Sequence, residues 1–291
     1  MDTIIGLGQA GCNLADCFSK YDEYDVYKID VGLDAYEETP YGDFPKEGLY
    51  SMPLQANPES YEQACPNMKN FFKDVTGEVL FICGGSGDIS GASLRVLQHL
   101  KGRDINVLYI RPDIDLLSER KRMQERVTFN VFQEYARSAV FKRMFIVDNS
   151  MVEQHLGDVP VIGYHDKLNE MIVSTMHMIN VYNHIESVTD TFSEPYETAR
   201  ISTIGLFDFD TEENKSFFPL DNAREIRYYY AINKDKLKSE GDLFKRIKKQ
   251  IKDNATDQTK VSYGIFATNY ERDFAYTLSY SASIQKGEID D

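Results

Sequence analysis

The sequence predicts an α/β fold in which a mostly parallel sheet comes first and a smaller α+β domain follows. Over the first 110 residues, short apolar runs typical of buried strands alternate with segments whose apolar residues recur at helical spacing. Strands separated by helices in this way form βαβ units, and such units build parallel sheets. The strands expected here are residues 3–6, 25–29, 79–83 and 107–110, and the helices are residues 12–20 and 92–100.

The pattern changes along the second half of the chain, where strand signals come to dominate. The elements expected there are long helices at residues 116–141 and 166–183, an amphipathic helix at 243–251, and strands at 145–147, 201–207, 227–232, 261–267 and 276–283. We therefore expect a first domain over residues 1–190 and a C-terminal α+β domain with its connecting helix over residues 191–285. A short acidic tail, residues 286–291, would follow them. No glycine- or serine-rich linker separates the two domains, so they are expected to pack closely.

Composition limits the classes of function. The 291 residues are 42% hydrophobic, which allows a large core, and their formal net charge is −15. An acidic surface of this kind repels the phosphates of nucleic acids and anionic membranes, so direct binding of nucleic acid is not expected. A free nucleotide that carries Mg²⁺ is not excluded in this way.

Cysteine and hydropathy patterns indicate a cytoplasmic protein without a membrane segment. The four cysteines contain no CxxC pair and match neither a zinc site nor a secreted disulfide framework. They fit free thiols in a reducing compartment. The histidines show no metal-ligand spacing, so no protein metal site is expected. We find no signal peptide, and no apolar run approaches the roughly 20 residues that a membrane-spanning helix needs.

A glycine-rich segment directly follows the first expected strand. Residues 6–11 read Gly-Leu-Gly-Gln-Ala-Gly and precede a helix expected to begin at Cys12. Glycines let the backbone approach a phosphate closely, and a helix N-terminus supplies unpaired N–H groups and partial positive charge. The same pattern fits a Rossmann-like dinucleotide fold with Asp30 as the ribose ligand, so a nicotinamide dinucleotide site is an alternative at this point. The candidate phosphate ligands are Gly8, Gln9, Ala10, Gly11 and Cys12.

A second glycine-rich segment begins where the third expected strand ends. Residues 84–91 read Gly-Gly-Ser-Gly-Asp-Ile-Ser-Gly, and backbone amides in such a segment can form an anion nest. The segment is not a Walker A loop, because no Gly-Lys-Ser/Thr follows, and neither segment contains a lysine. The Asp88 carboxylate is expected either to meet phosphates through Mg²⁺ or to point away from them. The candidate ligands are Gly84, Gly85, Ser86, Gly87, Asp88, Ser90 and Gly91.

Two phosphate loops without a lysine, in this order, resemble the tubulin/FtsZ superfamily. Residues 8–11, Gly-Gln-Ala-Gly, are similar to the first loop of tubulin. Residues 84–91 resemble the tubulin signature GGGTGSG, although Asp88 and Ile89 stand where the family has small residues. Residues 56–59, Ala-Asn-Pro-Glu, resemble the FtsZ loop that senses the γ-phosphate, which makes Asn57 a candidate ligand.

The resemblance continues after the fourth expected strand. Arg111-Pro112 and the later run Glu-Arg-Lys-Arg-Met at residues 119–123 resemble the FtsZ stretch in which a glutamate holds the ribose and an arginine nears the phosphates. Arg122 matches that arginine. By strict alignment Ser118 takes the glutamate position, and Glu119 is the nearest acid. Both Glu119 and Arg122 are therefore candidate nucleotide ligands.

The segments that would read the base also resemble the family. Asn149 follows Asp148 as in the tubulin pair whose asparagine reads guanine, and Asn169 matches a tubulin asparagine that pairs with the base edge. An amide offers both the donor and the acceptor that guanine requires. Tyr164 or His165 would stack on the base, since a shift of one residue leaves both open. By itself, Asn149 also fits a helix N-cap. The resemblance spans about residues 3–205 and implies a GTP or GDP site with Mg²⁺.

In this family, a loop of the neighbouring subunit presents acidic residues to the nucleotide and orients the attacking water. The matching candidates here are Glu194 and Glu197, with Asp190 as a third. Their spacing places the two glutamates on one face of an expected helical turn, with Pro195 at its start. Alone, the pair also fits acids that favour a helix dipole. The resemblance implies a homopolymer joined head to tail, in which assembly completes GTP hydrolysis.

Three classes of function remain open from the sequence. The first is a GTP-binding, filament-forming GTPase of the kind carried by phages or plasmids, whose acidic tails the last residues of this chain resemble. The second is a tubulin-like protein that binds nucleotide without hydrolysis or polymerisation, because the second loop and the acidic segment depart from the family pattern. The third is an NAD-binding Rossmann oxidoreductase, which gives the second loop no role.

Overall fold

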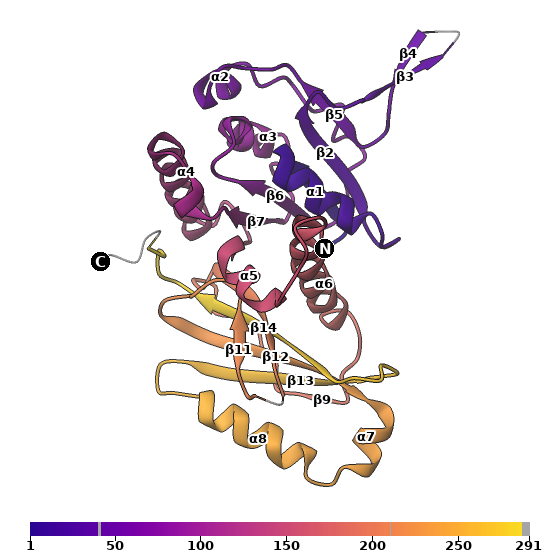
Figure 1. Cartoon of the computed structure of the whole chain (residues 1–291), viewed down its shortest axis with the longest axis vertical. Coiled ribbons are helices and arrows are strands. Elements are labelled where there is room, and N and C mark those ends of the chain that lie inside the picture. The colour runs from indigo at the N-terminus through magenta and orange to yellow at the C-terminus, as the bar shows by residue number, and fades with distance from the viewer. Residues whose placement is uncertain (40–41, 210, 287–291) are drawn as a thin grey trace.

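A single twelve-stranded sheet forms the centre of the computed structural model, which describes residues 1–39, 42–209 and 211–286 (Figure 1). The strand order is β5-β2-β1-β6-β7-β8-β10-β14-β12-β13-β9, with β11 paired to β10. A separate hairpin, β3–β4, projects from the N-terminal part. The strands are β1 Thr3–Leu7, β2 Asp25–Val31, β3 Tyr36–Thr39, β4 Gly42–Pro45, β5 Leu49–Met52, β6 Val79–Gly84, β7 Ile105–Arg111, β8 Arg143–Asp148, β9 Thr189–Asp190, β10 Ile201–Phe207, β11 Asn214–Ser216, β12 Ala223–Asn233, β13 Lys260–Thr268 and β14 Phe274–Ser281.

The N-terminal half of the sheet is parallel. From β5 through β2, β1, β6, β7 and β8 to β10, each neighbouring pair runs in the same direction. The chain starts in the middle with β1, builds outward to β5, and then returns to add β6 on the other side of β1. The carboxyl ends of these strands therefore share one edge, and the chain reverses its direction of growth between β1 and β6. In open α/β sheets, ligands bind at such a point.

Helices cover both faces of this parallel part, as expected for strands that are buried on both sides. One core packs α1, α5 and α6 onto one face through residues such as Phe18, Val152 and Ile172. The other packs α3 and α4 onto the opposite face through residues such as Val96 and Phe129. Within the described residues, no helix is both long and apolar enough to cross a bilayer. The helices are α1 Gly8–Phe18, α2 Pro58–Gln63, α3 Ser93–Gln98, α4 Glu119–Arg137, α5 Asn149–Leu156, α6 Tyr164–Tyr182, α7 Lys234–Ser239 and α8 Leu243–Asn254, with short 3₁₀ turns η1 Asp88–Ala92 and η2 Ile114–Leu116.

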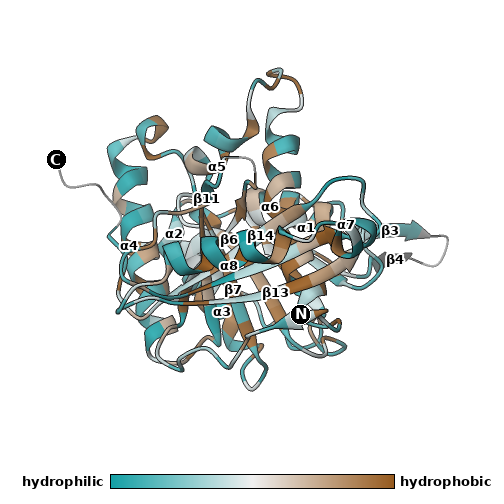
Figure 2. Ribbon diagram, turned by 90° about the horizontal axis from the view of Figure 1, so that it is seen from below, coloured by the Kyte–Doolittle hydropathy of each residue, from teal (hydrophilic) through white to brown (hydrophobic). Residues whose placement is uncertain are grey.

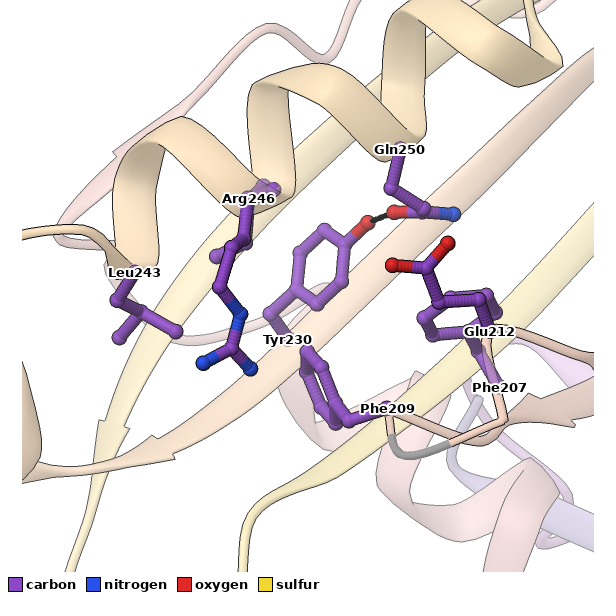
Figure 3. A pocket seen from close by; sticks show the side chains of 8 residues that line it. Phe207, Phe209, Glu212, Tyr230, Leu243, Arg246 and Gln250 are labelled. Carbon is purple, nitrogen blue, oxygen red and sulfur yellow. Dashed lines mark hydrogen bonds between the residues drawn. The ribbon is translucent and has the colours of Figure 1, made fainter.

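The C-terminal half of the sheet is mixed. β14 is antiparallel to both β10 and β12, whereas β13 is parallel to β12. α7 and α8 lie against this part (Figure 1), and α8 buries Leu243 and Ile247 in a third, smaller core. Between α8 and the sheet, Figure 3 shows a small hollow in which the Tyr230 hydroxyl donates to Gln250 Oε1. None of the sequence-predicted site residues lines this hollow.

The structure confirms the expected fold class and the principal strands, and it corrects several elements. The structure adds β3, β4, β5, β9, β11, α2 and α7, which were not expected because they are short and lack a clear apolar period. The connecting helix expected after residue 191 is wrong, since residues 191–200 form no helix. Their start is bonded to β13 instead, through Thr191 N–H and the Tyr263 carbonyl at 2.8 Å. The division at residue 190 stays a prediction; β8 and β10 pair across it within one sheet. Of the expected tail, residues 287–291 lie outside the described residues.

We predict that Gly11→Ala destabilises the fold, because an added Cβ would overlap the carbonyl oxygen of Ile82 on β6. Overpacking of this kind costs about 1–3 kcal/mol. Urea unfolding without nucleotide measures the change in the free energy of unfolding. Gly241→Ala is the matched control, since its Cβ would meet no atom of the described residues within 4 Å. Equal stabilities for the two variants would contradict the close packing of β1, α1 and β6.

Candidate functional site

Four of the sequence-predicted segments meet at one edge of the sheet. β1, β6, β7 and β8 end there at Leu7, Gly84, Arg111 and Asp148. Each strand leads directly into a segment singled out in the sequence, because parallel neighbours end at the same edge. α5 lies between α4 and α6 in both ribbon views (Figures 1 and 2). The edge therefore gathers the phosphate, ribose and base candidates into one region.

The first glycine segment is the beginning of a helix. α1 starts at Gly8, four residues earlier than expected, so Gln9, Ala10 and Gly11 form its first turn. Gly8 has φ +70°, which a residue with a side chain adopts only with strain, and its Cβ would lie 2.7 Å from Ile89 of the second segment. Gln9 and Ala10 are exposed. Because the first N–H groups of a helix lack intrahelical partners, this turn presents donors at the edge.

Cys12 is a candidate phosphate ligand, but its side chain is not available for that role. Its thiol points into the protein and donates to the carbonyl oxygens of Gly6 and Ile29, each at 3.6 Å. Burial, followed by the negative charge of Asp30, raises the pKa of Cys12 to about 12. The thiol is therefore protonated at neutral pH, and a role as ligand would rest on the backbone of Cys12.

Hydrogen bonds from α4 hold the second glycine segment in shape. The Gln124 amide donates to the carbonyl oxygens of Gly87, at 2.8 Å, and Gly85, at 3.4 Å. Ser90 Oγ also donates to the Gly85 carbonyl, at 3.2 Å. Gly85 and Ser90 are buried, Gly87 is exposed, and Gly84, Ser86 and Gly91 are partly exposed. Gln124 is a supporting residue that the sequence did not single out, because it lies 37 residues from Gly87 in the chain.

Asp88 faces α4. Its Oδ1 forms an ion pair with Lys121 Nζ at 2.6 Å, and both side chains are about one-third exposed. This contact favours the expectation that the carboxylate points away from bound phosphates. An exposed pair of this kind stabilises the fold little, but it brings a lysine to a loop that contains none. In the sequence, Lys121 is part of the basic run at residues 119–123, and no role was predicted for it individually.

Asn57 caps a helix beside the second segment. Its Oδ1 accepts from the Ser60 N–H at 2.8 Å, so it is the N-cap of α2. α2 packs against η1, which brings the Asn57 turn to the second glycine segment. The fold thus places this motif next to the predicted phosphate loop. Whether Asn57 also contacts a phosphate stays a prediction.

Arg122 and Glu119 both lie on the first turn of α4. Glu119 is exposed. Arg122 turns back along its own chain, where its Nε donates to the Leu117 carbonyl at 3.1 Å and its Nη2 to the Asp115 carbonyl at 3.2 Å. Arg122 therefore stabilises the loop that leads into α4. For Arg122 to contact a phosphate as predicted, its side chain would have to give up these two hydrogen bonds.

A buried ion network joins the ends of β7 and β8 to α4. Arg111 Nε donates to Glu125 Oε1 at 3.0 Å, and Nη1 lies 3.7 Å from Asp148 Oδ2. The Arg111 and Glu125 side chains are 5% and 3% exposed. The guanidinium also lies 4.7 Å from the centre of the Phe129 ring. Since removing one member leaves an uncompensated buried charge, this network fixes α4 against the edge.

Asn149 has an acceptor without a partner. The N-cap of α5 is Asp148, whose Oδ1 accepts from the Ser150 N–H at 2.9 Å, so the N-cap alternative for Asn149 is wrong. Asn149 Oδ1 is buried and has no hydrogen-bond partner among the described residues. Buried polar atoms are nearly always paired, and an exception in a folded protein calls for an explanation such as a ligand. This atom fits the expected contact with a base.

The first turn of α6 carries the ring candidates. Burial and a hydrogen bond to the Glu153 carboxylate on α5 raise the pKa of Tyr164 to about 12. Tyr164 is partly buried, whereas His165 is exposed and meets the Tyr164 ring edge-on, with centroids 5.2 Å apart. Asn169 is partly exposed on the next turn. Of the two rings, that of Tyr164 is the more buried, and base stacking by either ring stays a prediction.

The acidic candidates lie beyond the other end of α6. The helix has nineteen residues, so its two ends are roughly 28 Å apart at 1.5 Å per residue. After α6, Asp190 and Glu194 line one hollow together with Asn183 and Arg227. Glu197 is exposed but does not line this hollow. The structure thus groups Glu194 with Asp190 and places both far from the glycine segments.

Comparisons with known proteins identify the fold. No protein-family model matches the sequence, and no curated protein matches it. Among solved structures, a four-stranded filament of TubZ-Bt aligns with a TM-score of 0.71 at 17% identity, covering 96% of this chain and 85% of that chain. The FtsZ dimer of M. jannaschii aligns at 0.61 and 13%, covering 96% and 87%. A GTPγS-bound protofilament of CetZ2 from Haloferax volcanii aligns at 0.61 and 16%, covering 96% and 92%. The resemblance to the tubulin/FtsZ superfamily is confirmed for the fold.

We predict that Glu125→Ala lowers the free energy of unfolding by about 3–5 kcal/mol, because it leaves the Arg111 charge buried without its nearest carboxylate. Urea unfolding followed by circular dichroism measures the loss. Glu134→Ala on the same helix is the control, since Glu134 pairs with Arg137 in solvent and such pairs contribute about 0–1 kcal/mol. A loss for Glu125→Ala no larger than that of the control would contradict the role assigned to the network.

We predict that Asn149→Leu weakens GTP binding about 5- to 30-fold while leaving the free energy of unfolding unchanged or raised. The substitution removes a buried acceptor that has no partner within the part of the chain that the structure describes, and losing one hydrogen bond to a ligand costs about 1–2 kcal/mol. Calorimetric titration with GTP and urea unfolding give the two quantities. Asn130→Leu, which changes an exposed amide on α4, should alter neither. A destabilised Asn149→Leu that binds GTP normally would show that the amide is structural.

Proposed function

We propose that this chain, which has the tubulin/FtsZ fold, binds GTP at the strand-end edge and assembles head to tail into filaments. Acidic residues from the segment after α6 of one subunit would then complete GTP hydrolysis on the next. One observation carries the proposal: the predicted nucleotide ligands and the acidic segment lie at opposite ends of α6. A subunit therefore cannot bring its own acids to its own nucleotide, whereas a stacked neighbour can.

Backbone groups would hold the phosphates. The free N–H groups at the start of α1 and the partial positive charge of that helix end favour an anion. Lys121, kept at the second glycine segment by Asp88, supplies a positive charge that neither segment contains. When a nucleotide is bound, the Mg²⁺ that accompanies it would neutralise charge on the phosphates.

Side chains on α5 and α6 would select the base. The unpaired Oδ1 of Asn149 can accept from the N–H groups on the guanine edge, which adenine does not present in the same arrangement. Asn169 offers a second amide on α6. The partly buried Tyr164 ring on α6 would cover one face of the base.

Carboxylates of the neighbouring subunit would orient the attacking water. Asp190 and Glu194 share one hollow, so both are assigned this role, and Glu197 is kept as a further candidate. A contact between unlike surfaces that does not close on itself extends into a filament. The similar structures support this arrangement, since those of TubZ-Bt and CetZ2 are described as a filament and a protofilament.

A second function is favoured by two departures from the family pattern. The asparagine- and aspartate-rich run that the family has before its acids is absent, since Thr191, Phe192 and Ser193 precede Glu194 here, and Asp88 occupies the second loop. Both features fit a tubulin-like protein that binds nucleotide without hydrolysing it. Hydrolysis coupled to assembly separates the two functions.

We predict that phosphate release from GTP–Mg²⁺ and right-angle light scattering both rise steeply above a threshold protein concentration. Asp190→Asn and Glu194→Gln should slow phosphate release per assembled subunit about 100-fold, as expected for lost acid–base groups, with GTP affinity unchanged. Glu197→Gln shows whether that residue contributes. Glu271→Gln, an exposed acid in the turn before β14, is the control and should behave as wild type.

Three outcomes count against this proposal. GTP binding without scattering or phosphate release supports the second function. Loss of GTP binding in Asp190→Asn or Glu194→Gln means that the acidic segment has been assigned to the wrong site. NADH fluorescence enhancement without GTP binding contradicts both tubulin-like functions.

A further inference from the structure

We propose that Arg227 on β12 is a positioning residue that holds the acidic segment after α6 in the shape that presents Glu194 to the next subunit. The inference rests on the proposed function, and it names the side chain that sets the geometry of the acids. Arg227 itself touches neither nucleotide nor water in this arrangement. It acts through Ser193, the residue before Glu194.

The segment starts as an edge strand. Val188 N–H donates to the Ile265 carbonyl at 2.7 Å, and β9 pairs with β13 in antiparallel register. Thr191 N–H donates to the Tyr263 carbonyl at 2.8 Å, while its Oγ1 accepts from Tyr263 N–H at 3.1 Å. These bonds fix residues 188–191 along β13. They end three residues before Glu194.

Beyond the last backbone bond to β13, two cationic side chains hold the segment. Arg227 Nη2 donates to the Ser193 carbonyl, and Lys260 Nζ donates to Ser193 Oγ. The Arg227 guanidinium also lies 5.4 Å from the centre of the Phe192 ring. The direction of the chain into Glu194 is therefore set by side chains from β12 and β13.

Arg227 is itself held rigidly. Its Nε donates to Glu225 Oε1 at 2.8 Å, and the same oxygen accepts from Ser262 Oγ at 3.0 Å. The Glu225 side chain is 1% exposed and that of Arg227 is 10% exposed. A buried ion pair adds little net stability compared with apolar residues of similar size, and its best-attested use is to specify one arrangement. Here the arrangement that it specifies is the path of residues 192–194.

The sheet also leaves room for the segment. Gly264 on β13 lies beneath Phe192, and an added Cβ there would come within 2.6 Å of the Phe192 ring. The Phe192 ring packs on Tyr229, with centroids 5.0 Å apart. A methyl group at residue 264 would therefore lift Phe192 and shift Ser193 away from Arg227. Gly264→Ala provides a second route to the same displacement without touching the buried ions.

The test compares Arg227→Met with Arg224→Met, an exposed arginine on the same strand. Arg227→Met removes the bond to Ser193 while keeping most of the side-chain volume, and it also leaves the Glu225 carboxylate buried without its cation. We expect phosphate release per assembled subunit to fall about 10- to 100-fold, which is the size of effect that a misplaced reactive group produces. GTP affinity should stay unchanged, because the nucleotide site is at the far end of α6. Gly264→Ala should show the same pattern. Arg227→Lys should recover part of the rate, since an ammonium group cannot keep both partners of the planar guanidinium.

Filaments mixed from two variants distinguish a displaced acidic segment from a general loss of structure. Arg227→Met has an intact nucleotide site, and Asn149→Leu has an intact acidic segment. The GTP concentration is set to fill the site of Arg227→Met but not that of Asn149→Leu. In an equal mixture about one quarter of the head-to-tail contacts join these two intact halves, so phosphate release should rise well above the mean of the separate variants. No rise in copolymers, or a wild-type rate in filaments of Arg227→Met, would overturn the proposal.

Amide hydrogen exchange tests the role of Arg227 independently of phosphate release, and therefore independently of the proposed function. If wild-type filaments release no phosphate, the proposed function fails. The N–H groups of Thr191 and Phe192 donate to the Tyr263 carbonyl and to Asp190 Oδ1. Their exchange should still accelerate about tenfold in Arg227→Met and stay unchanged in Arg224→Met, because loss of a tethering bond raises local opening. Equal exchange in the two variants would show that Arg227 does not hold the segment.

Discussion

The candidate site depends on the close approach of β1, β6 and the first turn of α1. These elements meet because the chain reverses its direction of growth between β1 and β6, and Gly11 fits against the Ile82 carbonyl only without a side chain. Once this contact is made, the carboxyl ends of four parallel strands share one edge. The α1 N-terminus, the second glycine segment and the starts of α4 and α5 are then neighbours.

α6 separates two unlike ends of the molecule. Its first turn lies beside α5 at the edge with the glycine segments, and its last residue leads to the acidic segment on β13. A rigid helix keeps these two ends apart, so each subunit offers unlike surfaces at its two ends. Under the proposed function, a complete catalytic site forms only where two subunits meet, which couples hydrolysis to assembly.

A buried arginine stabilises the loop arrangement at each of these ends. Arg111 joins Glu125 and Asp148 where β7 and β8 end, and Arg227 joins Glu225 to the segment after α6. In both places a strand has ended and backbone pairing no longer determines the path of the chain. Charged groups that are costly to bury accept few geometries. They therefore suit positions where one path must be selected from several.

The parallel strands, the two glycine segments and the order of the family motifs were determined by the sequence alone, because apolar runs and glycine turns are local patterns. The side-chain partners were decided only by the tertiary structure. Asp88 pairs with Lys121 across 33 residues, and Arg227 reaches Ser193 across 34. The helix expected around Glu194 and Glu197 failed for the same reason, since β13 takes up the backbone bonds of Thr191 that precede it. Local pattern shows which residues are able to bond, whereas the packing of distant elements decides which of them do.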